Sequence, residues 1–71
     1  MEIDGAKVRT LRLARVLGQR ELAECAGVTR ETIAKIEGGQ RVRSYPATIR
    51  KLAAALGVKP RELLKERAHD I

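Results

Sequence analysis

Apolar residues recur at helical spacing along most of the chain, and short stretches rich in glycine, proline or polar residues separate them. No stretch alternates regularly between apolar and polar residues, as a half-buried strand does. The interruptions divide the sequence into five short helices, expected at about 5–17, 19–26, 30–37 and 46–56 and in a segment that begins at 60. The pattern therefore predicts an all-α fold.

The ends of these helices are marked by residues that favour helix termini. Asp4 and Thr29 are good N-caps, and Pro46 and Pro60 suit the first turn of a helix. Gly27 suits the left-handed turn that ends one. The side chains expected to face the core follow the helical repeat: Val8, Leu11, Leu22, Ala23, Ala26, Val28, Ile33, Ile36, Ile49, Leu52, Ala53 and Leu56.

Composition narrows the class of protein. The 71 residues make a single small domain, with a core expected over about 4–67. Cys25 is the only cysteine and His69 the only histidine, so neither an internal disulfide nor a Cys/His metal site is expected. Cys25 is expected to be a small buried apolar residue. A chain with neither a membrane-spanning run nor a signal peptide is expected in the cytoplasm.

Charge points to a class of partner. Fifteen lysines and arginines oppose nine acidic residues, which gives a net charge of +6. Such an excess is typical of nucleic-acid binders, although a solvated charged surface explains it equally well on charge alone. Tyr45 is the only aromatic residue, and proteins that bind single strands stack bases on aromatic rings. The composition therefore favours the phosphates and grooves of a duplex.

The stretch from 21 to 37 predicts two short helices joined by a tight turn. Gly27 tolerates the positive φ of such a turn, and Ala23 provides the small side chain needed where two helices cross closely. Apolar residues lie next to Ala23 and next to Gly27 in the sequence. This is the pattern of a helix-turn-helix, in which the second helix enters the major groove of DNA. An ordinary αα-hairpin is the alternative.

Two runs of the sequence resemble the Cro and phage-repressor type (XRE-like) helix-turn-helix family. They are LGQRELAECAGVTRETIAKIEGGQR at 17–41 and IRKLAAALGV at 49–58. The resemblance implies a five-helix, lambda-repressor-like domain that binds operator DNA, usually as a homodimer, to regulate transcription. The chain departs from the family at Val16, where glycine is common, and at Gly18, where serine or threonine is common. Its loop before Pro46 is also slightly long.

The resemblance also implies a buried ion pair between Arg12 and Glu37. Both residues lie on helix faces that otherwise carry inward-facing aliphatic side chains. A charge on such a face is costly unless it is paired. The alternative is that both side chains extend to water.

Side chains on the outer side of the second motif helix are the candidates for reading bases. If Ile33 faces inward, Glu31 and Lys35 point almost the opposite way, and Arg30 lies on a flank of the first turn. Arginine suits the two acceptors of guanine, and glutamate can accept from the cytosine amino group. The resemblance implies base contacts at Thr29, Arg30, Glu31 and Lys35. A solvated helix face is the alternative for Arg30 and Glu31.

A second set of residues is expected to contact the DNA backbone and so to orient the domain. Gln19 begins its helix, where its side chain and the unpaired N–H groups can hold a phosphate, as the matching glutamine does in the family. Flank or phosphate contacts are expected at Gln19, Thr32, Gly39, Gln40, Arg41 and Arg43.

Neither catalysis nor a cofactor is expected, because the sequence has no Gly-rich phosphate loop, metal cluster or nucleophile–base pair. The sequence instead predicts a sequence-specific regulator of transcription that binds double-stranded DNA. A single small domain acts most simply by blocking polymerase, which favours a repressor. The alternative is an antitoxin or another subunit of a regulatory complex, which binds a toxin or other protein. Leu13, which faces outward, is a candidate for such an interface or an isolated surface leucine.

Assembly as a homodimer is expected, because one short helix contacts little DNA and binds specifically only weakly. A twofold dimer joins two recognition helices on an inverted repeat whose half-sites are centred about 34 Å apart. Val58, Leu63 and Leu64 are the candidate dimer contacts, with closure of the monomer's own core as the alternative.

Overall fold

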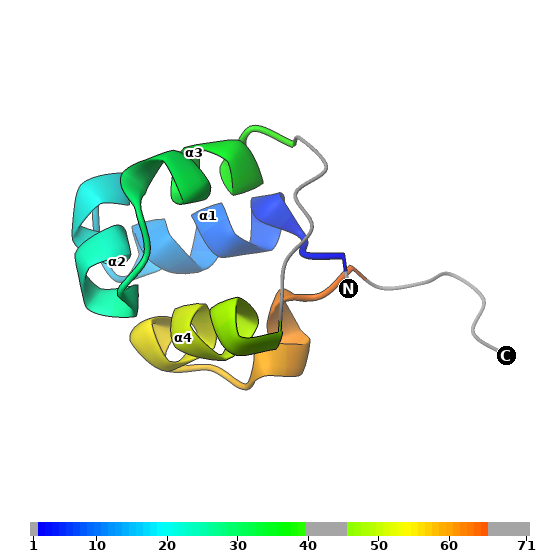
Figure 1. Cartoon of the computed structure of the whole chain (residues 1–71). Helices are drawn as coiled ribbons and strands as arrows, with labels where there is room; N and C mark the ends of the chain where they lie inside the picture. The colour runs from blue at the N-terminus through cyan, green and yellow to red at the C-terminus, as the bar shows by residue number, and fades with distance from the viewer. Residues whose placement is uncertain (1, 40–45, 66–71) are drawn as a thin grey trace, which may run out of the picture.

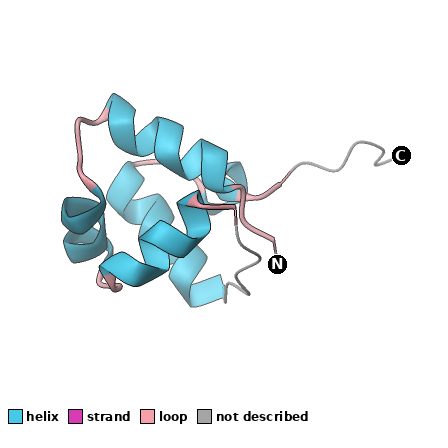
Figure 2. Ribbon diagram, turned by 90° about the horizontal axis from the view of Figure 1, so that it is seen from above, coloured by secondary structure: helices cyan, strands magenta, loops and turns pink. Residues whose placement is uncertain are grey.

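The fold consists of helices joined by short turns, as a computed structural model shows for residues 2–39 and 46–65. In chain order the elements are α1 (Gly5–Ala14), α2 (Gln19–Ala26), α3 (Arg30–Glu37), α4 (Pro46–Leu56) and a short 3₁₀ helix, η1 (Pro60–Leu63). The helix α2 packs against both α3 and α4, and α1 packs against α3 and η1 (Figure 1). Seen from above, the described chain is drawn as helices and loops alone (Figure 2). The all-α prediction is confirmed for these residues.

Polar groups begin the first three helices, and Asp4 and Thr29 are the N-caps that the sequence predicts. The Asp4 carboxylate accepts from two backbone N–H groups in the first turn of α1, at 3.1 and 3.3 Å. The Thr29 hydroxyl accepts from the Thr32 N–H at the start of α3, at 3.2 Å. Gly18 has no side chain to offer α2, but the Glu21 carboxylate accepts from the Gly18 N–H at 2.8 Å. These bonds satisfy N–H groups that have no partner within a helix.

The helices α1, α2 and α4 end in the same backbone motif. One residue turns left-handed, and the N–H of the next residue donates to the carbonyl five positions earlier, at 3.0–3.1 Å. Gly27 and Gly57 hold this position after α2 and α4, with φ of 72° and 71°, and Val16 holds it after α1 with φ of 55°. The helix expected to reach Leu17 therefore ends at Ala14, because the chain turns at Val16.

Aliphatic side chains from every helix form one core. The positions that the apolar pattern places inward are buried, except Leu11 and Val28, which are half-buried against the core. Cys25 is exposed, so the expectation that it is buried is wrong. The buried stripe of α2 is centred between Leu22 and Ala23, and Cys25 lies roughly 100° around the helix from that centre. The Cys25 side chain therefore lies on the solvent side of α2.

The fifth element is a 3₁₀ turn and not an α-helix. After η1, Leu64 is extended and pairs with Ile3 as an isolated antiparallel bridge. The Asp4 N–H donates to the Leu63 carbonyl at 2.7 Å. Because backbone groups here bond to the segment before α1, they do not continue a helix. The same pairing holds Ile3 in the core, at 7% exposure.

Candidate nucleic-acid interface

The two motif helices, α2 and α3, are held together by their buried faces. Ala23 and Ala26 of α2 are buried, and so are Ile33 and Ile36 of α3. Small side chains on α2 let the backbones of two helices approach closely. The turn between them passes through the left-handed Gly27. This packing leaves the opposite side of α3 open to solvent.

The exposed side of α3 carries the side chains that the sequence assigns to base reading. Arg30, Glu31 and Lys35 are all exposed. Within the described part of the chain, no hydrogen bond or ion pair engages their side chains. Their donors and acceptors are therefore available to a ligand, and Arg30 and Glu31 stand in the first turn of the helix.

Two threonine hydroxyls are held together at the start of α3. The Oγ1 atoms of Thr29 and Thr32 lie 2.9 Å apart, and Thr29 Oγ1 also accepts from the Thr32 N–H. Thr29 is exposed and Thr32 is half-buried. The pair fixes the geometry of the helix start, and each hydroxyl keeps further capacity for hydrogen bonding.

A buried network connects α1, α2 and α3 behind this surface. Arg12 donates to Glu37 through two bonds, from Nε to Oε2 at 2.7 Å and from Nη2 to Oε1 at 2.8 Å. The side chains of the pair are 9% and 4% exposed. Arg12 Nη1 also donates to the Leu17 carbonyl at 2.7 Å, and Gln19 Nε2 donates to Glu37 Oε1 at 3.3 Å. Such bidentate, charge-assisted bonds are geometrically specific, so the network sets how α3 sits on α1.

The network also keeps both of its charged members ionised. Burial acts to raise the pKa of Glu37, but hydrogen bonds from Arg12 and Gln19, with the charges of Arg12 and Arg9, hold that pKa below its usual value. The hydrogen bond to Glu37 raises the pKa of Arg12 against the opposing effect of burial. The carboxylate therefore remains an acceptor that orients Gln19.

Gln19 stands at the first position of α2 and is half-buried. One of its amide hydrogens is used by Glu37, which leaves the second and the amide oxygen available. At the far end of α3, Gly39 is exposed with φ of 80°. The other candidate backbone contacts lie outside the described residues: Gln40, Arg41 and Arg43.

The three candidate dimer residues differ in how much surface they leave for a partner. Leu63 has no exposed surface and belongs to the chain's own core. Val58 and Leu64 are half-buried against that core. Among the described residues, the large hydrophobic residues that are exposed are Leu13 and Val16, at 53% and 87% exposure.

Two further arginines, Arg9 and Arg15, have tertiary roles that the sequence does not predict. The charge of Arg9 acts on Glu37, and its spacing three residues before Arg12 on α1 was a signal that both lie near one carboxylate. Arg15 Nε donates to the Leu56 carbonyl at the end of α4, at 2.8 Å. No local signal indicates that contact, because 41 positions separate the two residues.

A family model described as a helix-turn-helix domain matches residues 5–66. The chain belongs to this family. The resemblance to the Cro and XRE-like type of helix-turn-helix, predicted from the sequence, is confirmed. Within residues 2–39 and 46–65, every helix is too short or too polar to span a bilayer.

Known proteins resemble the chain over most of its length. The HTH-type transcriptional repressor RghR of Bacillus subtilis is 45% identical over 58 residues, which are 82% of this chain and 43% of RghR. The restriction-modification controller protein C.AhdI of Aeromonas hydrophila has a TM-score of 0.77 and 43% identity, covering 84% of this chain and 89% of C.AhdI. The chain spans less than half the length of the curated relatives it matches.

A structure of the biofilm regulator SinR from Bacillus subtilis in complex with DNA is also similar. Its TM-score is 0.78, with 25% identity over 83% of this chain and 94% of the SinR chain. The relatives are transcriptional regulators of the helix-turn-helix type, and a structural neighbour binds DNA. The exposed side of α3 is therefore the candidate interface with duplex DNA.

Proposed function

We propose that this protein is a sequence-specific repressor that occupies operator DNA as a homodimer. The observation that carries the proposal is the row of exposed, unengaged polar side chains on α3: Arg30, Glu31 and Lys35. They project from a helix whose other side is buried on α2 and tied to α1 by the Arg12–Glu37 pair. A rigid helix with free donors and acceptors suits the major groove.

Each exposed side chain of α3 has a role that its chemistry supports. Arg30 in the first turn donates to the two acceptors of a guanine, and Glu31 accepts from a cytosine amino group. Lys35, one turn later, reaches a guanine or a phosphate. Thr29 contacts the DNA at the entry of the helix, with its hydroxyl positioned by Thr32.

The backbone contacts orient the domain. Gln19 binds a phosphate with the amide group that Glu37 orients, together with the first N–H groups of α2. Thr32 and Gly39 flank the recognition helix, and the segment that contains Gln40, Arg41 and Arg43 follows it. These contacts set register and affinity and carry no sequence information.

The repressor and homodimer parts of the proposal rest on different support. The repressor RghR is 45% identical to the chain. A dimer adds a second recognition helix to a surface that is otherwise small for specific binding. Val58 and Leu64, both half-buried, are the proposed dimer contacts, with Leu63 supporting them from the core.

Selection of bound sequences from random duplex DNA tests the reading of bases. The wild-type chain is expected to select an inverted repeat. Arg30→Ala should bind that site about 1–3 kcal/mol more weakly and lose preference at one base pair in each half-site. Lys59→Ala removes the same charge at an exposed position outside the helix-turn-helix and serves as the matched control. Recovery of an unchanged motif by Arg30→Ala, at equal information content, would refute the role of Arg30.

A further inference from the structure

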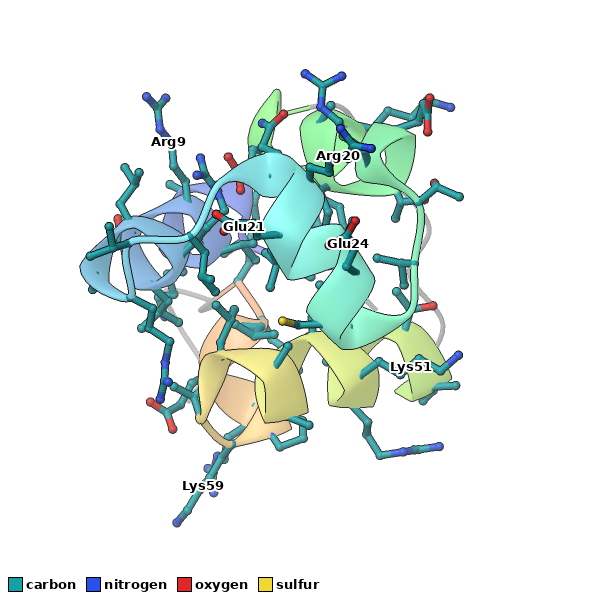
Figure 3. The ribbon with its side chains drawn as sticks, turned by 90° about the vertical axis from the view of Figure 1, so that its left-hand side faces the viewer. Arg9, Arg20, Glu21, Glu24, Lys51 and Lys59 are labelled. Carbon is teal, nitrogen blue, oxygen red and sulfur yellow. The ribbon has the colours of Figure 1, made fainter. Side chains whose placement is uncertain are left out.

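Two exposed arginines outside the expected contact set project from one edge of the molecule. In Figure 3, the side chains of Arg9 on α1 and Arg20 on α2 extend beyond the ribbon at the upper edge, to which α3 also belongs. Lys59 projects from the opposite edge, and Glu21 and Glu24 lie between the two edges on the face of α2. Arg9, Arg20 and α3 therefore share one edge of the molecule, and Lys59 lies at the opposite edge.

Arg9 acts on the buried network by its charge but makes no hydrogen bond within it. Its positive charge contributes to the lowered pKa of Glu37, the last residue of α3. Both oxygens of the Glu37 carboxylate already accept hydrogen bonds from Arg12, at 2.7 and 2.8 Å. Among the described residues no hydrogen bond or ion pair engages Arg9, which is exposed. Its guanidinium donors are therefore available.

Arg20 has one weak partner. Its Nε lies 3.8 Å from Oε2 of Glu24, and the two side chains are 81% and 71% exposed. An exposed ion pair of this length is readily exchanged for a stronger acceptor. Arg20 follows Gln19, whose amide shares the Glu37 carboxylate with Arg12. Arg20 thus adjoins Gln19 in sequence, where a phosphate is expected, and the charge of Arg9 acts on the carboxylate that Gln19 bonds.

We propose that Arg9 and Arg20 each bind a backbone phosphate, which extends the DNA contact from the helix-turn-helix onto α1. The proposal rests on the DNA-binding function proposed above. Guanidinium groups bind phosphate oxygens through paired N–H donors, and a ligand on the exposed side of α3 meets this edge next. Contacts to phosphate alone add affinity and salt dependence and leave sequence preference unchanged.

The test measures binding of the full chain to its selected operator as a function of salt concentration. The logarithm of the association constant falls as the logarithm of the salt concentration rises. Each of Arg9→Gln and Arg20→Gln should make this slope less steep by about 0.9 per bound chain. Both variants should select the same motif as the wild type. Arg9→Lys, which keeps the charge, should retain most of the slope.

Two control variants separate a contact from other effects. Lys59→Gln changes the net charge equally at the opposite edge and should leave the slope close to that of the wild type. Glu24→Gln removes the helical partner of Arg20 but keeps Arg20, and binding should not weaken. If Arg20→Gln weakened DNA binding only because the ion pair with Glu24 is lost, Glu24→Gln would weaken binding to the same extent.

The outcomes distinguish this proposal from the one on which it rests. If Arg9→Gln and Arg20→Gln match Lys59→Gln in slope, the proposed phosphate contacts are absent. If either variant selects a different motif, that residue reads bases and the phosphate assignment is overturned. If the wild-type chain binds no duplex, the DNA-binding function itself fails.

Discussion

Val16 occupies a backbone conformation that β-branched residues avoid. Its φ of 55° places it in the left-handed region, where an L-residue costs about 1–2 kcal/mol. The residue is 87% exposed, so little packing offsets that cost. The bonds that end α1, and not the preference of the valine, impose the conformation. Val16 is therefore a source of strain in the fold.

Replacing Val16 tests this strain. Val16→Gly should raise the free energy of unfolding by up to about 1 kcal/mol, because relief of the strain exceeds the entropy that glycine adds to the unfolded chain. Urea denaturation measures the change. Val16→Ala keeps a Cβ and should gain less. A glycine variant that is less stable than the alanine variant would show that the left-handed turn is not strained.

The ionisation of Glu37 should make stability depend on pH. Its pKa is lower in the folded chain than in the unfolded one, so the ionised form stabilises the fold above the ordinary glutamate pKa of about 4.3. This contribution is lost as the pH falls through the lower pKa of the folded state. The free energy of unfolding should therefore fall on acidification below about pH 5.

Glu37→Gln identifies the source of that dependence. The variant should lose about 3–5 kcal/mol at neutral pH, because Arg12 stays buried without a counter-charge. Its unfolding free energy should also change less steeply below about pH 5. Glu31→Gln, an exposed substitution on the same helix, is the control and should follow the wild type. A variant at Glu37 with wild-type stability would mean that the pair does not support the fold.

At the scale of elements, the first turn of α1 contacts the last turn of α3 backbone to backbone. A Cβ placed on Gly5 would overlap the Ile36 carbonyl oxygen. Helix propensity alone favours alanine over glycine by about 1 kcal/mol. The close approach of the two backbones predicts instead that alanine at this position destabilises the fold. Substitution of Gly5 therefore distinguishes the effect of helix propensity from that of the contact between α1 and α3.

Gly5→Ala should therefore destabilise the fold by about 1–3 kcal/mol, because α1 must move away from α3. Ala6→Gly, at the exposed next position, should cost only its helix propensity, about 1 kcal/mol. Thermal and urea unfolding followed by circular dichroism measures both. Greater stability of Gly5→Ala would show that α1 leaves room for a Cβ beside the Ile36 carbonyl.

The bounds of α2, α3 and α4 agree with the sequence prediction, because residues within a few positions set them. Thr29 caps α3 through its own side chain, and Gly27 and Gly57 end α2 and α4 where positive φ is needed. The end of α1 differs, since a valine gives no local signal for a left-handed turn. The last element differs because Leu64 bonds to the segment before α1.

At the scale of the whole molecule, the proposed dimer predicts how affinity depends on the operator. Two half-sites centred about 34 Å apart should be bound far more tightly than one, because the second contact becomes intramolecular. Binding to operators with one or two half-sites is compared with sedimentation of the free chain. Equal affinity for both, with one chain on each, would exclude the dimer and leave the helix-turn-helix assignment intact.

The sequence alone determined the helical class, the helix-turn-helix at 19–37 and the row of outward polar residues on the second motif helix. Local propensity, helical periodicity and caps depend on residues within a few positions of one another, so they can be recognised from the sequence. Tertiary structure alone decided the contact of Arg15 with Leu56, the bond from Gln19 to Glu37 and the burial of Ile3. Arg15 and Gln19 join residues 41 and 18 positions away, and partners at such distances are chosen by how the helices pack.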